Sequence, residues 1–423
     1  MKTIEFKNLD LNVFYEKLDN GLEIYVLPKN NVNNIYVTFS TKYGSNIIEF
    51  KPRNQKEFIK VPLGIAHFLE HKMFEQEDNT DIFAFYSERG ADCNANTDYT
   101  KTTYLFSGPN FLEENLNMLL DYVQKPYFTD ENVDKEKGII TQEIKMYQDQ
   151  PNTVMYDKLL ENCFKNHPMQ NPIIGTIESI NSITKEDLYT CYNTFYHPSN
   201  MFVVITGNVN PEETINIIKN NQNKKNFEDI EKFKIKKYDE PEDVKKKEFT
   251  TNLNVTIPKC AIAYKIKVEK NIQNLFYLLI LFDCKFGATS DFVEKLLDEE
   301  IINDNLYVDF DNSTDYTILF VTGDSVKPNL LLDKIKQELK NLKISEQEFL
   351  RKKKTVLSSL IYMSENIFSL NSNIMSDIIK YGKFNNNKYN DIKNLNYKDF
   401  NNLIKKINFD NYTTVIINPK KQS

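Results

Sequence analysis

Two histidines and a glutamate stand close together in the stretch Leu63 to His71, LGIAHFLEH. His67 and His71 are four residues apart, and Glu70 lies between them. On a helix with 3.6 residues per turn, side chains at positions i, i+3 and i+4 point to the same side. The chain of 423 residues has only four histidines, so this pair is a notable use of a scarce residue. The spacing predicts one helical face on which the three side chains act together.

Two imidazoles at this spacing can bind one metal ion, and zinc is the metal that most often takes such a pair. A neighbouring carboxylate can then act as a general base on water that the metal activates. The pattern H-x-x-E-H is that of the inverzincins. A single helical histidine is more often a core or surface residue, but the whole pattern favours a metal site. His67 and His71 are therefore predicted metal ligands and Glu70 the predicted base. Cobalt or manganese could occupy the same ligands in vitro.

A zinc hydrolase usually has three protein ligands and one open position, so a third ligand is expected. His167 and His197 each precede a proline, which favours loops or helix ends, and a structural role is the simpler interpretation of both. The helix expected over Asp130 to Gln148 contains Glu136 and Glu143, which are almost two turns apart and share a face. One carboxylate could bind the metal while the other hydrogen-bonds a ligand imidazole. Two solvated glutamates on a charged helix are the alternative.

The composition restricts the class of protein. A length of 423 residues predicts two domains or more. The net charge of −7 argues against a nucleic-acid groove, and five cysteines without paired spacing fit a reduced compartment. The N-terminus lacks the apolar stretch of a signal peptide, and the longest apolar run, Leu275 to Phe282, is too short for a membrane span. These features predict a cytoplasmic protein that binds neither nucleic acid nor membrane.

The order of expected strands and helices is similar in the two halves of the chain. Residues 1–219 form the half that contains the metal motif, and residues 220–248 are dense in charge and form an expected linker. Residues 249–423 then repeat the order of strand, helices, hairpin and helices. We expect an α+β fold of two structurally repeated domains, each an antiparallel sheet packed with helices. The second copy contains no histidine, so it cannot hold the same metal.

Several blocks of the chain occur in the order of a known family. These are GIAHFLEHKMF, GADCNANTDYTKTTYLFSG, EKGIITQEI followed by NPIIGTIESI, and FYHPSNMFVVITGNV. The sequence resembles the pitrilysin/insulinase family of zinc peptidases. More narrowly, it resembles the catalytic subunits of small bacterial peptidases related to mitochondrial processing peptidase. The resemblance is dense from about Asn20 to Val209 and thinner beyond, and it implies the metallohydrolase fold of that processing peptidase.

The resemblance implies a role for each candidate residue. His67, His71 and Glu143 match the family's ligands to one zinc ion per chain. Glu70 matches the general base, and Glu136 matches the carboxylate that hydrogen-bonds a ligand imidazole.

The resemblance also implies where the substrate peptide binds. The family's substrate-pairing edge strand matches the stretch of Asn94, Ala95, Asn96 and Thr97. A polar strand beside a metal site can take an extended peptide as one more strand, through backbone hydrogen bonds. An ordinary edge strand blunted by polar residues is the alternative.

The second half departs from the family pattern at one position. Family members carry there an Arg and a Tyr, seven residues apart, that reach the scissile carbonyl and the substrate backbone. In the corresponding stretch, LLDEEIINDNLYVDF, Tyr307 can fill the Tyr position, but Glu300 stands where the Arg is expected. A carboxylate cannot stabilise a developing oxyanion. In two-subunit relatives a metal-free paralogue supplies the Arg and the Tyr, so the resemblance implies a heterodimer.

The sequence as a whole predicts a zinc-dependent endopeptidase that acts on short or unstructured peptides, as the catalytic subunit of a heterodimer. Processing of a leader peptide is one candidate role within this prediction. The alternative is a non-catalytic structural or peptide-binding subunit of the same fold.

Overall fold

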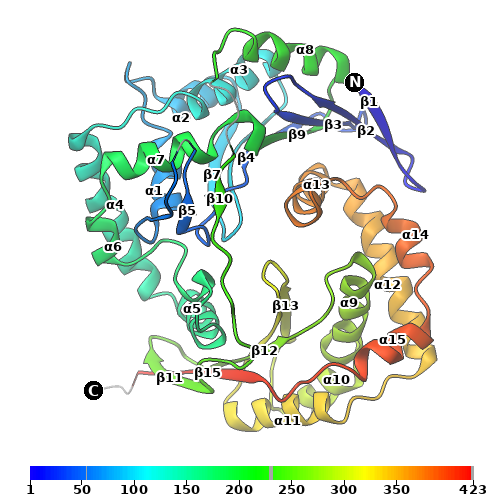
Figure 1. Cartoon of the computed structure of the whole chain (residues 1–423). Coiled ribbons are helices and arrows are strands. Elements are labelled where there is room, and N and C mark those ends of the chain that lie inside the picture. Colours follow the sequence, from blue (N-terminus) through cyan, green and yellow to red (C-terminus); the bar gives the residue numbers. More distant parts are fainter. Residues whose placement is uncertain (54, 228–231, 421–423) are drawn as a thin grey trace. The chain divides into compact units, whose positions relative to one another are not determined.

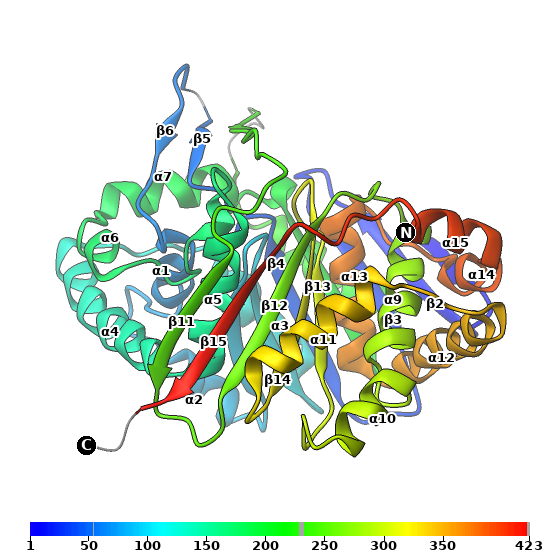
Figure 2. The same ribbon diagram turned by 90° about the horizontal axis from the view of Figure 1, so that it is seen from below.

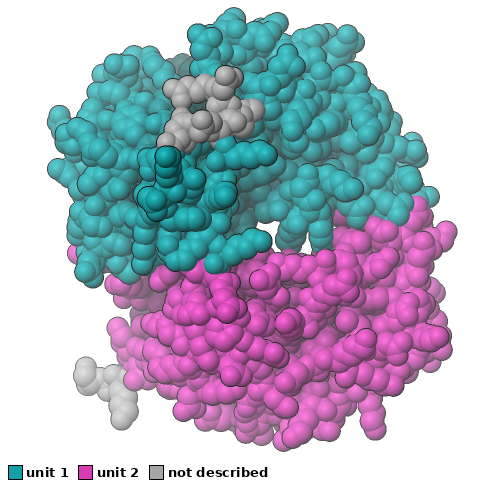
Figure 3. All heavy atoms as spheres, viewed as in Figure 1, with its two compact units in different colours: residues 1–144, 172–237, 361–387 teal, residues 145–171, 238–360, 388–423 magenta. Residues whose placement is uncertain are grey.

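The computed structural model describes residues 1–53, 55–227 and 232–420. Runs of strands and runs of helices follow one another along the chain (Figure 1), which confirms the expected α+β class. Two compact units contain the described residues (Figure 3). Unit 1 comprises residues 1–144, 172–237 and 361–387, and unit 2 comprises residues 145–171, 238–360 and 388–423.

The main sheet of unit 1 has seven strands among the described residues, in the order β1-β2-β3-β9-β4-β8-β7. Their bounds are β1 Lys2–Phe6, β2 Leu11–Lys17, β3 Glu23–Pro28, β4 Ile35–Thr41, β7 Asp92–Thr97, β8 Thr102–Gly108 and β9 Met201–Gly207. Strand β9 is buried throughout and lies between β3, to which it is parallel, and β4, to which it is antiparallel. A small separate sheet contains β5 (Glu49–Lys51), β6 (Ile59–Lys60) and β10 (Lys234–Ile235).

The sheet of unit 2 repeats part of this topology. Its strands follow the order β11-β15-β12-β14-β13 (Figure 2), with β11 Glu248–Leu253, β12 Lys259–Ile266, β13 Tyr307–Asp311, β14 Thr317–Asp324 and β15 Tyr412–Pro419. Strand β15 is parallel to β11 and antiparallel to β12, as β9 is to β3 and β4. The hairpin of β13 and β14 corresponds to that of β7 and β8. Each sheet is thus mixed rather than purely antiparallel, because its last strand in the chain is parallel to an earlier one, β9 to β3 and β15 to β11.

The helices also follow one order in the two halves. In the first half they are α1 Ile65–Lys72, α2 Ile82–Ser87, α3 Leu112–Val123, α4 Asp130–Gln148, α5 Pro151–Cys163, α6 Ile177–Asn181, α7 Lys185–Phe195 and α8 Pro211–Gln222. In the second half they are α9 Ile272–Phe286, α10 Asp291–Asp298, α11 Pro328–Lys340, α12 Glu346–Glu365, α13 Ile367–Tyr381, α14 Lys388–Lys393 and α15 Tyr397–Ile404. Two helices lie between β4 and β7, and two lie between β12 and β13. This correspondence supports the predicted pair of structural repeats.

Each compact unit contains one helix from the other half of the chain. In unit 1, α13 packs against β4 and β9, and the buried Thr38 hydroxyl donates to Oδ1 of Asn371 at 2.8 Å. In unit 2, α5 packs against β12 and β15, and Nδ2 of Asn162 donates to the Thr413 hydroxyl at 3.1 Å. The compact units therefore do not coincide with residues 1–219 and 249–423, and those sequence boundaries stay a prediction.

The segment expected as a linker, residues 220–248, contains the end of α8, strand β10 and the first residue of β11. Its residues 228–231 lie outside the described residues. Within the described ranges, every helix is too short or too polar to cross a lipid bilayer. The cytoplasmic location stays a prediction.

Candidate metal centre

The helix that carries His67 and His71, α1, begins after Gly64, at a position that accepts only glycine. Gly64 has a φ of 85°, and a Cβ atom on it would lie 2.3 Å from the Ile174 carbonyl oxygen. Gly175 has a φ of 82°, and its Cβ would lie 2.6 Å from the Leu63 carbonyl oxygen. The Ser179 hydroxyl donates to that same carbonyl at 2.9 Å. Two glycines from separate sequence blocks thus fix the start of α1 against the segment before α6.

Three predicted ligands converge within unit 1. The ring centroids of His67 and His71 are 4.6 Å apart on α1. Glu143 on α4 lies beside both rings, with Oε1 3.8 Å from Nε2 of His67 and Oε2 3.5 Å from Nε2 of His71. One potential ligand atom of each residue lies within 4.8 Å of the others. The structure therefore brings the three residues together, and their binding of a metal stays a prediction.

The geometry of this donor set fits a zinc ion. Tetrahedral zinc with ligands at about 2.1 Å keeps its donor atoms about 3.4 Å apart, which is close to the 3.5 and 3.8 Å found between Glu143 and the imidazoles. In addition, Oε2 of Glu143 is buried and forms no hydrogen bond with the residues that the structure describes. A buried carboxylate oxygen without a partner is costly. A cation bound between the three side chains would remove that cost.

The local electrostatics leave one imidazole neutral. Burial, together with the adjacent His71, lowers the pKa of His67 to about 3, so its ring is neutral at pH 7 and can bind a metal. For His71, burial acts to lower the pKa, but the hydrogen bond with Glu136 and the charges of Glu136, Glu143 and Glu70 outweigh it and raise the pKa.

The predicted partner of a ligand imidazole is in contact with one. Oε1 of Glu136 lies 2.9 Å from Nδ1 of His71. An ionised carboxylate can only accept a hydrogen bond, so Nδ1 carries a proton. In the neutral ring that can bind a metal, Nε2 then holds the lone pair, on the side of Glu143. The geometry thus gives the two glutamates of α4 different positions, one on each side of the His71 ring.

A buried lysine, which the sequence reasoning missed, lies behind Glu136. The Lys72 side chain is fully buried, pairs with Glu75, and donates to the Asn132 carbonyl oxygen at 3.2 Å. Its Nζ atom lies 4.0 Å from Oε2 of Glu136. Lysine at the end of a short helix is usually exposed, and only the apolar residues around it, such as Met73, indicated burial. The Glu136 carboxylate therefore lies between an imidazole and a buried ammonium group.

The predicted base is buried beside the ligands. Glu70 is 8% exposed, and the Thr97 hydroxyl donates to its Oε2 atom at 2.6 Å. Burial raises the pKa of Glu70, with a contribution from Glu143, although the hydrogen bond from Thr97 and the charge of His71 act in the opposite direction. A raised pKa brings a carboxyl group closer to neutral pH, which suits proton transfer.

The predicted substrate strand forms an edge of the main sheet of unit 1. Strand β7 pairs with β8 and is last in the strand order among the described residues. It also adjoins α1. Asn94 and Asn96 are exposed, whereas Ala95 and Thr97 alternate with them and are half-buried. Successive side chains of a strand point to opposite faces of the sheet. This alternation could have predicted that Thr97 points to the other face from Asn94 and Asn96. Binding of substrate to this edge stays a prediction.

The other two histidines have structural contacts. Nδ1 of His167 accepts a hydrogen bond from the Met169 backbone N–H at 3.2 Å, and Nδ1 of His197 accepts one from Ser199 at 3.2 Å. Each begins a short 3-10 turn, Pro168–Gln170 or Pro198–Asn200. These contacts favour the structural interpretation of both residues.

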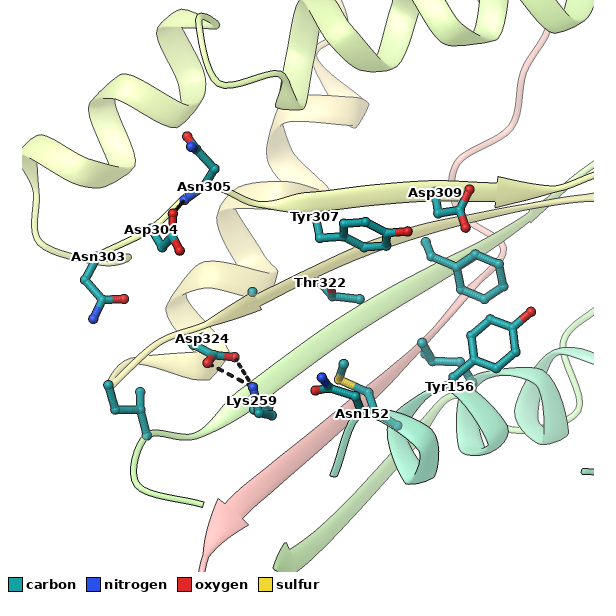
Figure 4. Close-up of a pocket in the computed structure, with 15 residues that line it drawn as sticks. Asn152, Tyr156, Lys259, Asn303, Asp304, Asn305, Tyr307, Asp309, Thr322 and Asp324 are labelled. Atoms are coloured by element: carbon teal, nitrogen blue, oxygen red, sulfur yellow. Dashed lines mark hydrogen bonds and ion pairs between the residues drawn. The ribbon is translucent and has the colours of Figure 1, made fainter. Parts of the chain in front are cut away.

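In unit 2, the tyrosine singled out in the sequence lines a cavity. Tyr307 is the first residue of β13, is 65% exposed, and borders a cavity of about 730 Å³ (Figure 4). The cationic side chain among the described lining residues, Lys259, is bound to Asp324 at 3.0 Å. Glu300 lies in the turn after α10, with a left-handed φ of 51°. The lining residues thus offer Tyr307 no uncommitted cation.

Comparisons with known proteins address the family. The model described as "Insulinase (Peptidase family M16)" matches residues 60–177, and the model described as "Peptidase M16 inactive domain" matches residues 182–356. A Bacillus subtilis (strain 168) protein named "Uncharacterized zinc protease YmfH" is 42% identical over 344 residues, which are 80% of this chain and 80% of that protein. The chain belongs to peptidase family M16. The predicted family is therefore confirmed.

Solved structures agree with this assignment. An M16-like peptidase from Alicyclobacillus acidocaldarius is 31% identical, with a TM-score of 0.92 over 98% of this M16 chain and 99% of that one. A protease from Helicobacter pylori, 18% identical, shares the fold with a TM-score of 0.82 over 96% of this chain and 99% of its own.

Proposed function

We propose that this M16 chain is a zinc-dependent endopeptidase that hydrolyses peptide bonds in short or unstructured peptides. The observation that carries the proposal is the convergence of His67, His71 and Glu143, with Glu70 beside them. A zinc ion bound there would supply a Lewis acid that activates water and polarises the peptide carbonyl. The names of relatives as zinc proteases support the same reaction.

The side chains of this site have separable tasks in peptide hydrolysis. Glu70 takes a proton from the attacking water and passes one to the leaving amine. Glu136 holds His71 with Nδ1 protonated, so that Nε2 stays directed toward Glu143. Glu70 is buried, so bulk water competes little for its carboxylate.

We propose that the peptide adds to the outer edge of β7. The recognition would use backbone hydrogen bonds, so it would require an extended peptide more than a particular sequence. Such a site suits short or unstructured chains, of which leader peptides are one class. The contact between β7 and α1 supports this placement, because it brings the edge strand beside the base.

We also propose that the chain works as the catalytic subunit of a heterodimer, with a paralogous chain that supplies the Arg and the Tyr. Glu300 stands where the cation would be needed, and the cavity at Tyr307 offers no uncommitted cation among its described lining residues. Sizing of the purified chain with and without the co-expressed paralogue tests this proposal. Full peptidase activity of the isolated chain would contradict it.

A non-catalytic, peptide-binding subunit is the second candidate function. It is favoured by Glu300 and by the match of residues 182–356 to a model named for an inactive domain. The two functions predict different outcomes when Glu70 is replaced.

The deciding experiment compares the zinc-loaded pair with its Glu70→Gln variant on a fluorogenic peptide. Loss of the base is expected to lower kcat by about 10²- to 10⁴-fold. The matched control is Glu131→Gln, an exposed carboxylate on α4, which is expected to leave the rate unchanged. An unchanged rate in Glu70→Gln would remove the mechanism. Absence of turnover in the unmutated pair, together with retained peptide binding, would favour the second candidate.

A further inference from the structure

We propose that Thr97 is a positioning residue for Glu70. Its hydroxyl anchors one carboxylate oxygen, Oε2, and leaves the other, Oε1, as the oxygen that takes the proton. The inference rests on the proposed peptidase function, because it concerns the base of that reaction. It gives Thr97 a task beyond its predicted place in the substrate strand.

The hydrogen bond has the length of a strong one. The Thr97 Oγ1 atom lies 2.6 Å from Oε2 of Glu70. Hydroxyl-to-carboxylate bonds of about 2.5–2.7 Å are charge-assisted and stronger than neutral hydrogen bonds. Glu70 is buried, so water competes little for this oxygen.

The direction of the bond follows from the number of protons available. Thr97 has one hydroxyl proton, and an ionised Glu70 can only accept, so Thr97 donates to Oε2. The neighbouring Thr102 hydroxyl lies 3.3 Å from Oγ1 of Thr97, and it can give its own proton to the Tyr43 carbonyl oxygen at 3.0 Å. Every hydroxyl proton in this group then has an acceptor.

The hydrogen bond from Thr97 to Oε2 also indicates which oxygen of Glu70 acts as the base. If Glu70 takes a proton on Oε1, then Oε2 remains an acceptor and the bond from Thr97 is kept. If the proton went to Oε2 instead, the Thr97 hydroxyl would have to turn away, toward Thr102. Protonation on Oε1 therefore changes the hydrogen bonding least. One oxygen serves as the anchor in both protonation states of Glu70.

The bond also couples the base to the edge strand. Thr97 is the last residue of β7 and pairs with Thr102 of β8. Asn94 and Asn96 are exposed on the same strand, whose outer edge is the proposed peptide site. Thr97 thus sets the position of Glu70 relative to the strand that would hold the peptide.

A purely structural role makes a different prediction. If Thr97 only fastened β7 to α1, its loss would lower stability or weaken peptide binding, and KM would change more than kcat. Loss of positioning instead lowers kcat and leaves KM and the affinity for zinc nearly unchanged, because the Thr97 hydroxyl contacts Glu70 and Thr102, and neither is a predicted metal ligand.

The test uses three variants of the zinc-loaded pair. Thr97→Val removes the hydroxyl at similar volume and is expected to lower kcat by about 10- to 100-fold, the size of a lost hydrogen bond to a charged group. Thr97→Ser keeps the hydroxyl and is expected to restore most of kcat. The control is Thr103→Val on β8, where the buried hydroxyl bonds Ser40 at 2.8 Å and not Glu70. It is expected to keep the unmutated kcat.

A kcat in Thr97→Val equal to that of the unmutated pair, or an equal loss in Thr103→Val, would overturn the inference. A crystal structure of Thr97→Val decides the anchoring without any turnover. The Glu70 carboxylate is expected to leave its original position in that variant and to keep it in Thr97→Ser. An unmoved carboxylate in Thr97→Val would refute the role of Thr97, whereas an inactive unmutated pair would refute only the proposed peptidase function.

Discussion

The Nδ1 atom of His71 lies 2.9 Å from Oε1 of Glu136. The carboxylate fixes the tautomer of the imidazole, because it can accept a hydrogen bond but cannot donate one. In the neutral ring, Nε2 therefore holds the lone pair, and it lies 3.5 Å from Oε2 of Glu143. This relationship supports the predicted role of Glu136, which is to orient His71 rather than to bind the metal.

Replacement of Glu136 by Gln is expected to weaken zinc binding by about 10- to 100-fold, as found for carboxylates that orient ligand histidines. The physical reason is that a neutral amide neither fixes the proton on Nδ1 of His71 nor offsets the charge of the buried Lys72. Competitive titration with a zinc chelator measures the effect.

The exposed Glu131 on the same helix supplies the control. Glu131→Gln is expected to bind zinc as tightly as the unmutated chain. Equal affinities in Glu136→Gln and Glu131→Gln would mean that Glu136 does not orient His71.

Replacement of Gly64 by Ala is expected to disturb α1 and, with it, zinc binding. The left-handed φ of 85° is unfavourable for alanine, and its Cβ would lie 2.3 Å from the Ile174 carbonyl oxygen. We expect the free energy of unfolding to fall by about 2 kcal/mol or more. Chemical denaturation and zinc titration measure the two effects.

Gly138→Ala is the matched variant for this prediction. Gly138 lies inside α4, and nothing is within 4 Å of a Cβ placed on it. Alanine there should stabilise the helix by about 0.5–1 kcal/mol. Equal destabilisation by the two substitutions would show that the close approach at Gly64 is unimportant.

The local pattern of α1 could be predicted, because the spacing of His67, Glu70 and His71 defines one helical face. The shared face of Glu136 and Glu143 could also be predicted, but the spacing alone could not say which of the two approaches both imidazole rings. Periodicity describes a helix by itself, whereas the division of tasks depends on how α4 packs against α1.

The sequence could not predict that α5 packs in unit 2 and α13 in unit 1. The apolar pattern of α5 and α13 predicts that each helix packs on a sheet, but it does not say on which one. The buried contacts of Asn371 with Thr38 and of Asn162 with Thr413 decide this in the structure. Such polar pairs join residues hundreds of positions apart, and the sequence gives no signal for them.

A buried ion pair in unit 2 is expected to contribute strongly to stability. Lys265 donates to Oε1 of Glu240 at 2.7 Å, and both side chains are buried. Three backbone N–H groups after α5 donate to the same carboxylate, those of Lys165, Asn166 and His167. Glu240→Gln leaves the Lys265 ammonium without its counter-charge and should cost about 3 kcal/mol. Asp130→Asn breaks the exposed pair with Lys185 and should cause no measurable change.

The same pair predicts a pH dependence of folding. Burial acts to raise the pKa of Glu240, but the hydrogen bonds from Lys265 and the backbone outweigh it and hold the pKa below its usual value. The stabilisation is therefore fully present above the usual pKa of about 4.3, and it is lost as the pH falls through the lower pKa of the folded state. Unfolding free energies should be measured from about pH 3 to about pH 7. They should fall less steeply with acid in Glu240→Gln than in the unmutated chain. Parallel curves for the two proteins would contradict this assignment.

Anomalous diffraction at the zinc edge, from crystals of the zinc-loaded chain, tests the metal centre most directly. The account predicts one peak per chain, in contact with His67, His71 and Glu143. A peak bound to other side chains, or the absence of any peak between these three residues, would contradict it.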